Sequence, residues 1–457
     1  MRPNLQELLQ SPQKIHFVGV GGSGTYPLVQ ILLPRGHKIS GSDVNETDII
    51  GYERSLGVNV IMRHQAENVH GADLVVYSAA IASNNPELAE AERLGIPAVE
   101  RSVMLAYVAS LYKRPLCVSG THGKTTTTAM ATQILEMAGL DPAAVIGGKL
   151  PYINGYGKGG NGDAMVLEAC EYHNTFLELI PETAVLLNID NDHLEFFGDM
   201  EHLMLAFRQF CAAATGAVLY NGDDERCSEV VAPLSLPCIS FGFEENCQLR
   251  AVNAHEYRPA LWAFDVEWDG VVQGEVRLLA PGRHNVYNAL AAYGGARRLG
   301  ASHQQCADGL LAFGGAGRRM EVLGTNKGIT IADDYAHHPA ELKATLSTAK
   351  ELDYKEVWAV FQPYTYSRTQ LLLQDFADVL PIADHVVMTA IMGGREQAED
   401  YTIRTSDLAV KIPGSVWFET QEETADYVMR TAKEGDLVIT LGCGDIYKCA
   451  RMMMNTK

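Results

Sequence analysis

The sequence predicts a three-domain α/β protein, with a Rossmann-like N-terminal domain, a central P-loop ATPase-type α/β domain and a Rossmann-like C-terminal domain. Short apolar runs of strand length alternate with longer runs of helical periodicity, which is the pattern of parallel sheets covered by helices. At 457 residues the chain is too long for one hydrophobic core, and its length favours about three domains. We expect these domains to cover residues 1–113, 114–317 and 318–457.

The N-terminal block opens with a predicted strand over residues 14–18 and the glycine loop Gly19-Val20-Gly21-Gly22-Ser23-Gly24. A second strand ends at Ser42-Asp43, and a glycine loop with an acid about 20 residues later is typical of a dinucleotide site. We favour a phosphate site for another nucleotide, because the chain carries a separate triphosphate loop further on. The other elements expected here are helix 28–33, strand 37–40, strand 73–78 and helix 86–94.

The central block begins with a strand over residues 115–119, followed by Gly120-Thr121-His122-Gly123-Lys124-Thr125-Thr126 and a helix over 129–138. Glycines let backbone N–H groups approach phosphate oxygens, and a helix N-terminus adds partial positive charge. We expect Lys124 to reach the β- and γ-phosphates, with Thr125 or Thr126 on Mg²⁺. Val118 replaces the first glycine of the full P-loop pattern, so an ordinary glycine-rich turn is the alternative. Consecutive β-branched threonines argue against that alternative.

Two further strands of the central block end in polar residues, at Glu168-Ala169-Cys170-Glu171 and at Asn188-Ile189-Asp190-Asn191-Asp192-His193. Because ligands gather beyond the carboxyl ends of parallel strands, we expect Lys124, Glu168 and His193 to meet at one edge. Thr125 and Glu168 offer the oxygen ligands that Mg²⁺ prefers, and His193 suits a second, softer divalent ion such as Mn²⁺. The alternatives are a hydrogen-bonded loop histidine at His193 and a surface carboxylate at Glu171.

The remaining elements follow the same alternation. The glycine-rich stretch 152–162 predicts a mobile loop, residues 238–279 are more β-like, and a helix begins near His284. The central block is also predicted to contain strands at 164–167 and 184–187. The C-terminal block is predicted to contain strands at 329–332, 357–361, 385–389 and 437–441, with helices at 341–352 and 370–380.

Three groups of residues in the C-terminal block are candidates for ligand contacts. The first group joins a strand to a helix and consists of Asp333-Asp334-Tyr335-Ala336-His337-His338-Pro339. Two acids and two histidines are costly to place together unless they have a function. We therefore expect this group to contact a nucleotide or a polar substrate. Arg368 could pair with a carboxylate or a phosphate, the alternative being a surface arginine at a helix start. The turn Gly442-Cys443-Gly444-Asp445 is interpreted as packing rather than a phosphate site.

Composition excludes several classes of protein. A net charge of −20 argues against a general nucleic-acid binder. No apolar run approaches the ~18 residues of a membrane span, and the first residues lack the apolar core of a signal peptide. Nine dispersed cysteines without a CxxC pair indicate reduced thiols, so we expect a cytoplasmic protein without a membrane or nucleic-acid partner.

In their order along the chain, these motifs resemble those of the Mur ligase family, and most closely those of its alanine-adding members. No single motif is as specific as the ordered set, which spans nearly the whole chain. The residues that carry the resemblance are Gly19 to Gly24 with Ser42-Asp43, Gly120 to Thr128, Glu168 to Glu171, Asn188-Ile189 with Asp192-His193, Gly282-Arg283-His284-Asn285 with Asn288, Gly317-Arg318-Arg319, Asp333 to Pro339, and Phe361-Gln362-Pro363 with Arg368.

The resemblance implies an ATP-dependent ligase with the substrates UDP-N-acetylmuramate, L-alanine and ATP, active in peptidoglycan precursor synthesis as a monomer or homodimer. The sugar nucleotide would lie on the N-terminal domain, at Gly21, Gly22, Ser23, Gly24, Ser42, Asp43, Ser78 and Asn85. The central domain would bind ATP through Gly120 to Thr126, with adenine near Asn285 and Asn288. The C-terminal domain would close over ATP through Arg319 and Asp334 and orient the amino acid through Arg368 and Tyr335.

The chemistry implied by the resemblance is amide formation through an acyl-phosphate, in which Lys124, Glu168 and His193 are the catalytic candidates. Two departures stand out. Several Mur ligases hold a second metal with a carbamylated lysine, yet no lysine occurs between His193 and Arg250. Some alanine-adding members carry an arginine where this chain has Thr365.

Three other functions stay open at this point. A ligase that attaches a preformed peptide to the same sugar nucleotide differs only in its amino-acid pocket. An NAD-dependent oxidoreductase is suggested by the loop Gly19 to Gly24, but it leaves Lys124, Glu168 and His193 unexplained. A catalytically silent nucleotide-binding regulator is disfavoured because the phosphate-loop lysine, hydroxyls and acid are all present.

Overall fold

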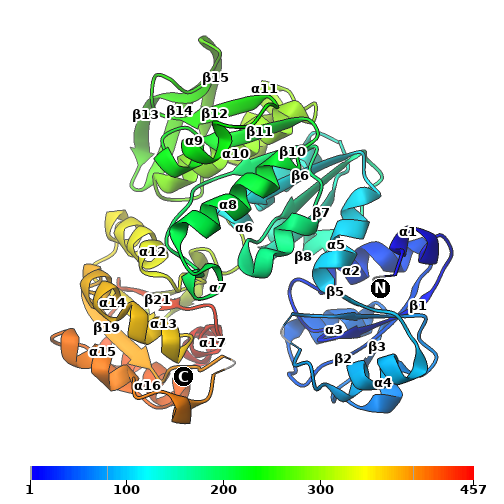
Figure 1. Ribbon diagram of the computed structural model, residues 1–457. Helices are drawn as coiled ribbons and strands as arrows, with labels where there is room; N and C mark the ends of the chain where they lie inside the picture. Colours follow the sequence, from blue (N-terminus) through cyan, green and yellow to red (C-terminus); the bar gives the residue numbers. More distant parts are fainter. Residues whose placement is uncertain (1–2, 80, 395, 457) are drawn as a thin grey trace. The chain divides into compact units, whose positions relative to one another are not determined.

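The computed structural model describes residues 3–79, 81–394 and 396–456, and Figure 1 labels many of their helices and strands. The chain divides into two compact units. The first consists of Met1–Asn253, Phe264–Val276 and Tyr287–Phe313, and the second of Ala254–Ala263, Arg277–Val286 and Gly314–Lys457. The described residues carry three sheets, and helices alternate with the parallel strands, so the predicted α/β class is confirmed. The domain boundaries near residues 113 and 317 stay a prediction.

The N-terminal sheet has the strand order β3-β2-β1-β4-β5 in the described residues, and its pairs are parallel. Four of the five residues of the central strand β1 (Lys14–Val18) are buried, as expected for a strand with helices on both faces. Strand 14–18 and helix 86–94 are confirmed. The remaining elements are α1 (Leu5–Leu8), α2 (Tyr26–Leu32), η1 (Leu33–Arg35), β2 (Lys38–Ser42), α3 (Asp48–Ser55), β3 (Asn59–Ile61), η2 (Ala66–Val69), β4 (Leu74–Tyr77), α4 (Pro86–Leu94), β5 (Ala98–Glu100) and α5 (Arg101–Ser110).

The central sheet runs β15-β14-β13-β12-β11-β10-β6-β9-β7-β8 in the described part of the chain. β6 (Arg114–Ser119) lies between β9 (Ala164–Glu168) and β10 (Thr183–Leu186), and both pairs are parallel, so their carboxyl ends share one edge. The other elements are α6 (Lys124–Met137), β7 (Ala143–Leu150), η3 (Pro151–Ile153), β8 (Gly155–Lys158), η4 (Tyr172–Glu178), α7 (Leu194–Phe197), α8 (Met200–Ala212), β11 (Ala217–Asn221), α9 (Glu225–Val231), β12 (Cys238–Gly242), β13 (Leu249–Arg258), β14 (Leu261–Trp268), β15 (Val271–Arg277), α10 (His284–Arg298) and α11 (His303–Leu311).

The glycine-rich stretch 152–162 is not the mobile loop that its composition predicts. β8 pairs antiparallel with β7 and closes one edge of the sheet. A Cβ on Gly157 would collide with the carbonyl oxygen of Ala144, and one on Gly160 would collide with the backbone of Asp141. These glycines therefore serve close backbone packing, and the prediction of a loop is wrong over β8.

The C-terminal sheet has the order β16-β17-β21-β18-β19-β20 among the described residues, with β16 antiparallel to its neighbour and the other pairs parallel. The strands predicted at 357–361, 385–389 and 437–441 are confirmed, whereas helix 370–380 is divided at Leu372 into α13 and α14. The elements are β16 (Glu321–Asn326), β17 (Ile329–Asp334), α12 (Pro339–Glu351), β18 (Val357–Phe361), α13 (Tyr366–Leu371), α14 (Leu373–Val379), η5 (Leu380–Ile382), β19 (His385–Thr389), η6 (Ala398–Asp400), α15 (Thr405–Lys411), β20 (Val416–Phe418), α16 (Gln421–Thr431), β21 (Leu437–Leu441) and α17 (Tyr447–Asn455).

Candidate active site

The loop between β6 and α6 presents backbone N–H groups at the start of a 14-residue helix. Gly120 and Gly123 have φ values of 133° and 86°, which glycine adopts without strain. The N–H groups of Gly123 and Lys124 have no acceptor among the described residues. Free N–H groups beside a helix N-terminus attract anions, so the local structure of a phosphate loop is present.

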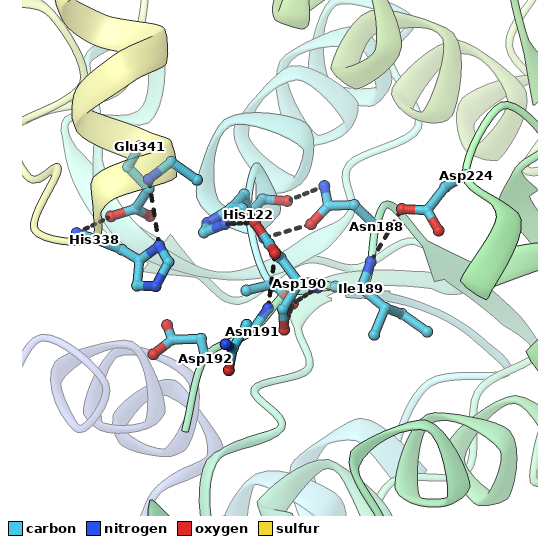
Figure 2. Close-up of polar contacts among 12 residues, drawn as sticks. His122, Asn188, Ile189, Asp190, Asn191, Asp192, Asp224, His338 and Glu341 are labelled. Atoms are coloured by element: carbon cyan, nitrogen blue, oxygen red, sulfur yellow. Dashed lines mark hydrogen bonds and ion pairs between the residues drawn. The ribbon is translucent and has the colours of Figure 1, made fainter. Parts of the chain in front are cut away.

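Asn188, which follows β10, fixes the phosphate loop from the neighbouring strand (Figure 2). Its side-chain oxygen accepts from the His122 N–H at 2.8 Å, and its amide nitrogen donates to the His122 carbonyl at 3.0 Å. The Thr121 hydroxyl accepts from the Asp190 N–H at 2.9 Å. The loops after β6 and β10 therefore form one hydrogen-bonded structure.

The Lys124 ammonium is held inside the protein. Its side chain is 15% exposed, and Nζ donates to the Glu171 carboxylate and to the Thr121 carbonyl, each at 2.9 Å. Burial alone would lower the pKa of Lys124, but nearby negative groups, with Glu171 foremost, raise it above its usual value, so the group stays charged. Because the Glu171 side chain is 2% exposed, its interpretation as a surface carboxylate is wrong.

Glu168 ends β9, directly beside the strand that carries the phosphate loop. One carboxylate oxygen accepts from the N–H of Gly147 on β7. A Cβ on Gly147 would lie 2.7 Å from both carboxylate oxygens, so a glycine is needed there. Glu168 also contributes to the raised pKa of Lys124, which shows that the two charges interact across the strand ends.

His193 lies in the third loop at this edge of the sheet. Its φ is 57°, and its N–H donates to the Asp192 carboxylate at 2.9 Å. The centroid of its ring is 4.6 Å from that of Tyr172, which directly follows Glu171. The loops that carry Lys124, Glu168 and His193 thus adjoin one another, as the sequence predicts, whereas their catalytic and metal-binding roles stay a prediction.

The oxygen donors at this edge suit a hard cation. Thr125 lies in the first turn of α6 and is 6% exposed, and Glu168 supplies a carboxylate. Within residues 3–79, 81–394 and 396–456, no three His, Cys, Asp and Glu side chains gather as a metal-ligand cluster. Mg²⁺ commonly binds through one or two protein oxygens together with water and phosphate, which is the arrangement that Thr125 and Glu168 fit.

The glycine loop of the N-terminal sheet has free backbone donors. The N–H groups of Gly22, Ser23 and Gly24 have no acceptor in the described part of the chain, and Gly22 and Ser23 are exposed. Asp43 holds the loop by accepting from the Gly21 N–H at 2.9 Å. Ser78 follows the neighbouring strand, where its N–H donates to the Val18 carbonyl at 3.2 Å. Adjacent N–H groups of this kind are suited to binding an anion.

Ser42 and Asn85, which were also predicted to contact the nucleotide, have internal partners. The buried Ser42 hydroxyl donates to Glu87 at 2.7 Å, and the Asn85 side chain accepts from the Glu87 N–H at 2.9 Å as the cap of α4. Glu87 also contacts His16 at 3.2 Å and His64 at 2.8 Å. The sequence analysis missed this cluster, because 71 and 23 positions separate the histidines from Glu87.

The end of β17 places two aspartates in different surroundings. Asp333 is buried and pairs with Arg318 at 2.7 Å. Asp334 accepts two backbone N–H groups at 2.7 Å, and burial raises its pKa to about 6, although Arg319 acts in the opposite direction. The Arg318 and Arg319 guanidinium carbons lie 5.0 and 5.3 Å from the centre of the Tyr335 ring. Asp334, Arg319 and Tyr335 therefore belong to one local cluster.

Arg318 also explains the glycine turn after β21. Its guanidinium donates to the Gly442 carbonyl at 2.7 Å and to the Gly444 carbonyl at 3.1 Å. The interpretation of this turn as packing is confirmed. His338 caps α12, and Glu341 accepts from its N–H at 3.4 Å (Figure 2).

Arg368 lies in α13, where the Thr365 hydroxyl caps the helix by accepting from the Arg368 N–H. Burial raises the pKa of Cys443 to about 12, and Arg368 partly opposes this. The pKa of Tyr335 is also raised, with burial as the largest cause and Cys443 as the next. Arg368 and Tyr335 are therefore both within electrostatic range of Cys443. Thr365 serves as the cap of α13.

Asn288 adjoins the phosphate loop. Its side-chain oxygen accepts from the Thr127 hydroxyl at 3.2 Å, and a Cβ on Gly123 would collide with it. Asn285 instead donates to the Pro281 carbonyl at 2.7 Å. Placement of adenine near these two residues stays a prediction.

Comparison with known proteins identifies the family. Three family models match in order: "Mur ligase family, catalytic domain" over residues 14–113, "Mur ligase middle domain" over 118–296, and "Mur ligase, glutamate ligase domain" over 318–444. A UDP-N-acetylmuramate–L-alanine ligase of Alkaliphilus metalliredigens (strain QYMF) is 39% identical over 447 residues, 97% of either chain. The chain belongs to the Mur ligase family. This membership confirms the resemblance and decides against an NAD-dependent oxidoreductase.

Solved structures agree with the fold of this Mur ligase. The UDP-N-acetylmuramate–alanine ligase of Thermotoga maritima aligns with a TM-score of 0.82 and 29% identity, over 97% of this chain and 98% of that one. A murein peptide ligase of Psychrobacter arcticus 273-4 aligns with a TM-score of 0.76 and 22% identity over 97% and 98%, which is a similarity of fold. None of the helices that the structure describes has the length and apolarity required to cross a membrane.

Proposed function

We propose that the chain joins the lactyl carboxylate of UDP-N-acetylmuramate to the amine of L-alanine, with cleavage of ATP to ADP and phosphate. The observation that carries this proposal is its similarity, over nearly the full length of both chains, to a relative named for that activity. The phosphate loop with its buried Lys124 supports the use of ATP. The product would serve peptidoglycan precursor synthesis in the cytoplasm, where the nine free cysteines remain reduced.

The reaction proceeds in two displacements. A lactyl carboxylate oxygen attacks the γ-phosphorus of ATP, the bond to the β–γ bridging oxygen breaks, and ADP leaves behind an acyl-phosphate. The amine of alanine then attacks the acyl carbon, phosphate leaves, the amine loses a proton, and an amide forms. ATP is needed because a free carboxylate is a poor acyl donor.

The residues of the central sheet would act on the first displacement. Lys124, held charged, would neutralise negative charge on the transferring phosphoryl group, and the free N–H groups of Gly123 and Lys124 would bind phosphate oxygens. Mg²⁺ held by Thr125 and Glu168 would supply further charge neutralisation. His193 is the candidate for a second divalent ion, Mg²⁺ or Mn²⁺.

The remaining substrate contacts extend this proposal to the other predicted residues. Gly21 to Gly24 and Asp43 would bind the sugar nucleotide, and Asn285 and Asn288 the adenine. Arg319 and Asp334 would contact ATP, and Arg368 with Tyr335 the amino acid. Ser42 and Asn85 are left out of the proposed contacts because their side chains have internal partners.

Phosphate release with UDP-N-acetylmuramate and ATP tests the proposed activity. We expect turnover with L-alanine to exceed turnover with glycine, L-serine or a tripeptide, because relatives of this name add alanine. The amide product is identified by mass spectrometry. A preference for the tripeptide would identify a peptide-adding ligase instead, and release without any added amine would show hydrolysis rather than ligation.

Arg368 is predicted to bind the carboxylate of the amino acid. We expect Arg368→Ala to raise the KM for alanine by about tenfold or more, since a charge-assisted hydrogen bond contributes about 1.5–3 kcal/mol. The KM for ATP should change little. Arg430→Ala, in α16 of the same unit, is the matched control, because its guanidinium contacts a backbone carbonyl on the surface. An unchanged KM for alanine would remove Arg368 from the amino-acid site.

A further inference from the structure

A pocket of about 440 Å³ lies between the last two strands of the central sheet and helix α10. Its volume is in the range of sites that hold small molecules, about 300–1,000 Å³. All of its lining residues belong to the first compact unit, and none of them is acidic. They are Trp268 of β14, Val271 and Gln273 of β15, and Arg297 and Arg298 of α10.

Helix α10 places this pocket at the edge of the central sheet opposite the phosphate loop. Near the start of the helix, Asn288 accepts from the hydroxyl of Thr127, which lies in the first turn after that loop. At its other end, Arg298 donates to the hydroxyl of Thr183, the first residue of β10, at 2.9 Å. The helix rises about 14 Å between Asn288 and Arg297, at about 1.5 Å per residue. The pocket is therefore separate from the candidate active site.

Arg297 gives the pocket a positive charge without an acidic partner. Among the described residues its guanidinium makes one hydrogen bond, from Nη1 to the Ala301 carbonyl at 3.3 Å, and its Nε is buried without an acceptor. A guanidinium has five N–H donors, so most of them are left for a ligand. Arg298, by contrast, is paired with Glu182 at 2.9 Å. Burial lowers the pKa of the neighbouring His303, and Arg297 lowers it further, so this ring stays neutral at neutral pH.

The apolar wall of the pocket is held in place by the packing of β14 and β15 on α10 and α11. The ring centroid of Trp268 lies 6.3 Å from that of Tyr293, which is fully buried in α10. The Tyr293 hydroxyl lies 3.0 Å from Nδ1 of His303, the first residue of α11. A Cβ on Gly274 of β15 would lie 2.6 Å from the Nε2 of the same histidine. Both strands are thus packed closely on the helices, and the pocket is formed before a ligand binds.

We propose that this pocket binds a small organic anion whose acidic group pairs with Arg297 and whose planar ring packs against Trp268. A guanidinium forms a bidentate pair with a carboxylate or a phosphate, and an indole offers a flat apolar face to another ring. An inorganic ion would gain nothing from Trp268 and the exposed Val271, so the lining favours an organic ligand. The site is independent of the proposed function, because none of its residues belongs to the proposed nucleotide and amino-acid contacts.

Fluorine NMR of the full chain labelled with fluorotryptophan tests this site, with 2-naphthoate as the probe. The Trp268 resonance is assigned by its absence from Trp268→Phe. ADP and UDP are present at saturating concentrations, so that the probe does not occupy a nucleotide site. We expect 2-naphthoate to shift the Trp268 resonance in a saturable manner. The resonances of Trp358 and Trp417, which lie in strands of the C-terminal sheet, should not move.

We expect Arg297→Gln to raise the Kd for 2-naphthoate by about tenfold or more, because it removes a charge-assisted pair. Arg297→Lys should lie between this variant and the wild type, since it keeps the charge but loses the bidentate geometry. Arg208→Gln is the matched control. The Arg208 guanidinium also contacts one backbone carbonyl and has a buried Nε without an acceptor in the described part of the chain, but it does not line the pocket.

A neutral analogue tests the same pairing on the wild-type chain, and it decides the question if the Arg297 variants do not fold. Naphthalene-2-methanol has the ring of the probe but no charge, so we expect it to bind at least about tenfold more weakly. Equal affinities for the acid and the alcohol overturn the inference, as does an unchanged Kd in a folded Arg297→Gln chain. An equal loss of affinity in Arg208→Gln also overturns it, because the attraction would then be non-specific. The same holds if millimolar probe produces no saturable shift of Trp268.

Discussion

We expect Lys124→Ala to lower kcat by at least about 100-fold, the effect of removing one well-placed group that stabilises charge in a transition state. The ammonium lies in the first turn of α6, directly after a loop with free N–H groups, and its pKa is raised by the surrounding carboxylates. It is therefore fully protonated at neutral pH and would oppose the charge on the transferring phosphoryl group. Near-normal turnover would contradict its assigned role.

The same substitution also affects stability, and this must be separated from catalysis. Lys124 is the ion-pair partner of Glu171, whose side chain is 2% exposed. Removing one member of a buried pair commonly costs about 3–5 kcal/mol, because the other charge stays buried without a partner. The double variant Lys124→Ala/Glu171→Gln removes both charges, so we expect it to recover stability without recovering activity. Thermal unfolding and single-turnover phosphate release, measured on both variants, separate the two effects.

The phosphate loop could be predicted from the sequence because its signal is local. A strand, two glycines, a lysine and a helix follow one another within 24 residues, from Arg114 to Met137, and the structure keeps that order. The adjacency of Glu168 and Asn188 to this loop required only the rule that parallel strands end at one edge. The burial of Glu171 was missed, because a strand end does not show which of two nearby acids turns inward.

Glycine-rich segments show the limit of that reasoning. The loop Gly19 to Gly24 and the stretch 152–162 are both rich in glycine. The N–H groups of Gly22, Ser23 and Gly24 have no acceptor among the described residues, whereas residues 155–158 pair as a strand. What distinguishes them is which backbone approaches each glycine, and that is set by tertiary packing. The hydrogen bond that the Arg101 guanidinium donates to the Gly24 carbonyl joins residues that are 77 positions apart, so no local sequence pattern predicts it.

Glu53 is a buried acid that no part of the proposed reaction uses. It lies in α3 with 0% exposure, and neither carboxylate oxygen has a hydrogen-bond partner among the described residues. Burial, assisted by the charge of Asp43, raises its pKa from 4.5 to about 8. The buried Tyr26 is a neighbour, because Glu53 contributes to the raised pKa of that tyrosine. Glu53 is therefore mostly protonated in the folded chain at neutral pH, whereas it is ionised in the unfolded chain.

The direction of the pH dependence follows from these two pKa values. The unfolded chain loses the Glu53 proton near pH 4.5, whereas the folded chain keeps it until about pH 8. The free energy of unfolding therefore falls as pH rises from about 4.5 to about 8. Below this range Glu53 does not change it, and above this range Glu53 causes no further decrease. Each pH unit in this range lowers the free energy of unfolding by about 1.4 kcal/mol, so Glu53 lowers it by on the order of 3 kcal/mol at pH 7.

We expect Glu53→Gln to be more stable than the wild type at pH 8 and equal to it near pH 4.5, because the amide keeps the shape but cannot ionise. Glu53→Leu should be more stable at both values, since it also removes the unsatisfied polar atoms. All four tryptophans lie beyond residue 113, so fluorescence would miss this region, and amide hydrogen exchange in β1 and β4 is the suitable measurement. If the Gln variant and the wild type differ equally at both pH values, ionisation of Glu53 is not the cause. If they do not differ at either, the carboxyl is solvated in solution.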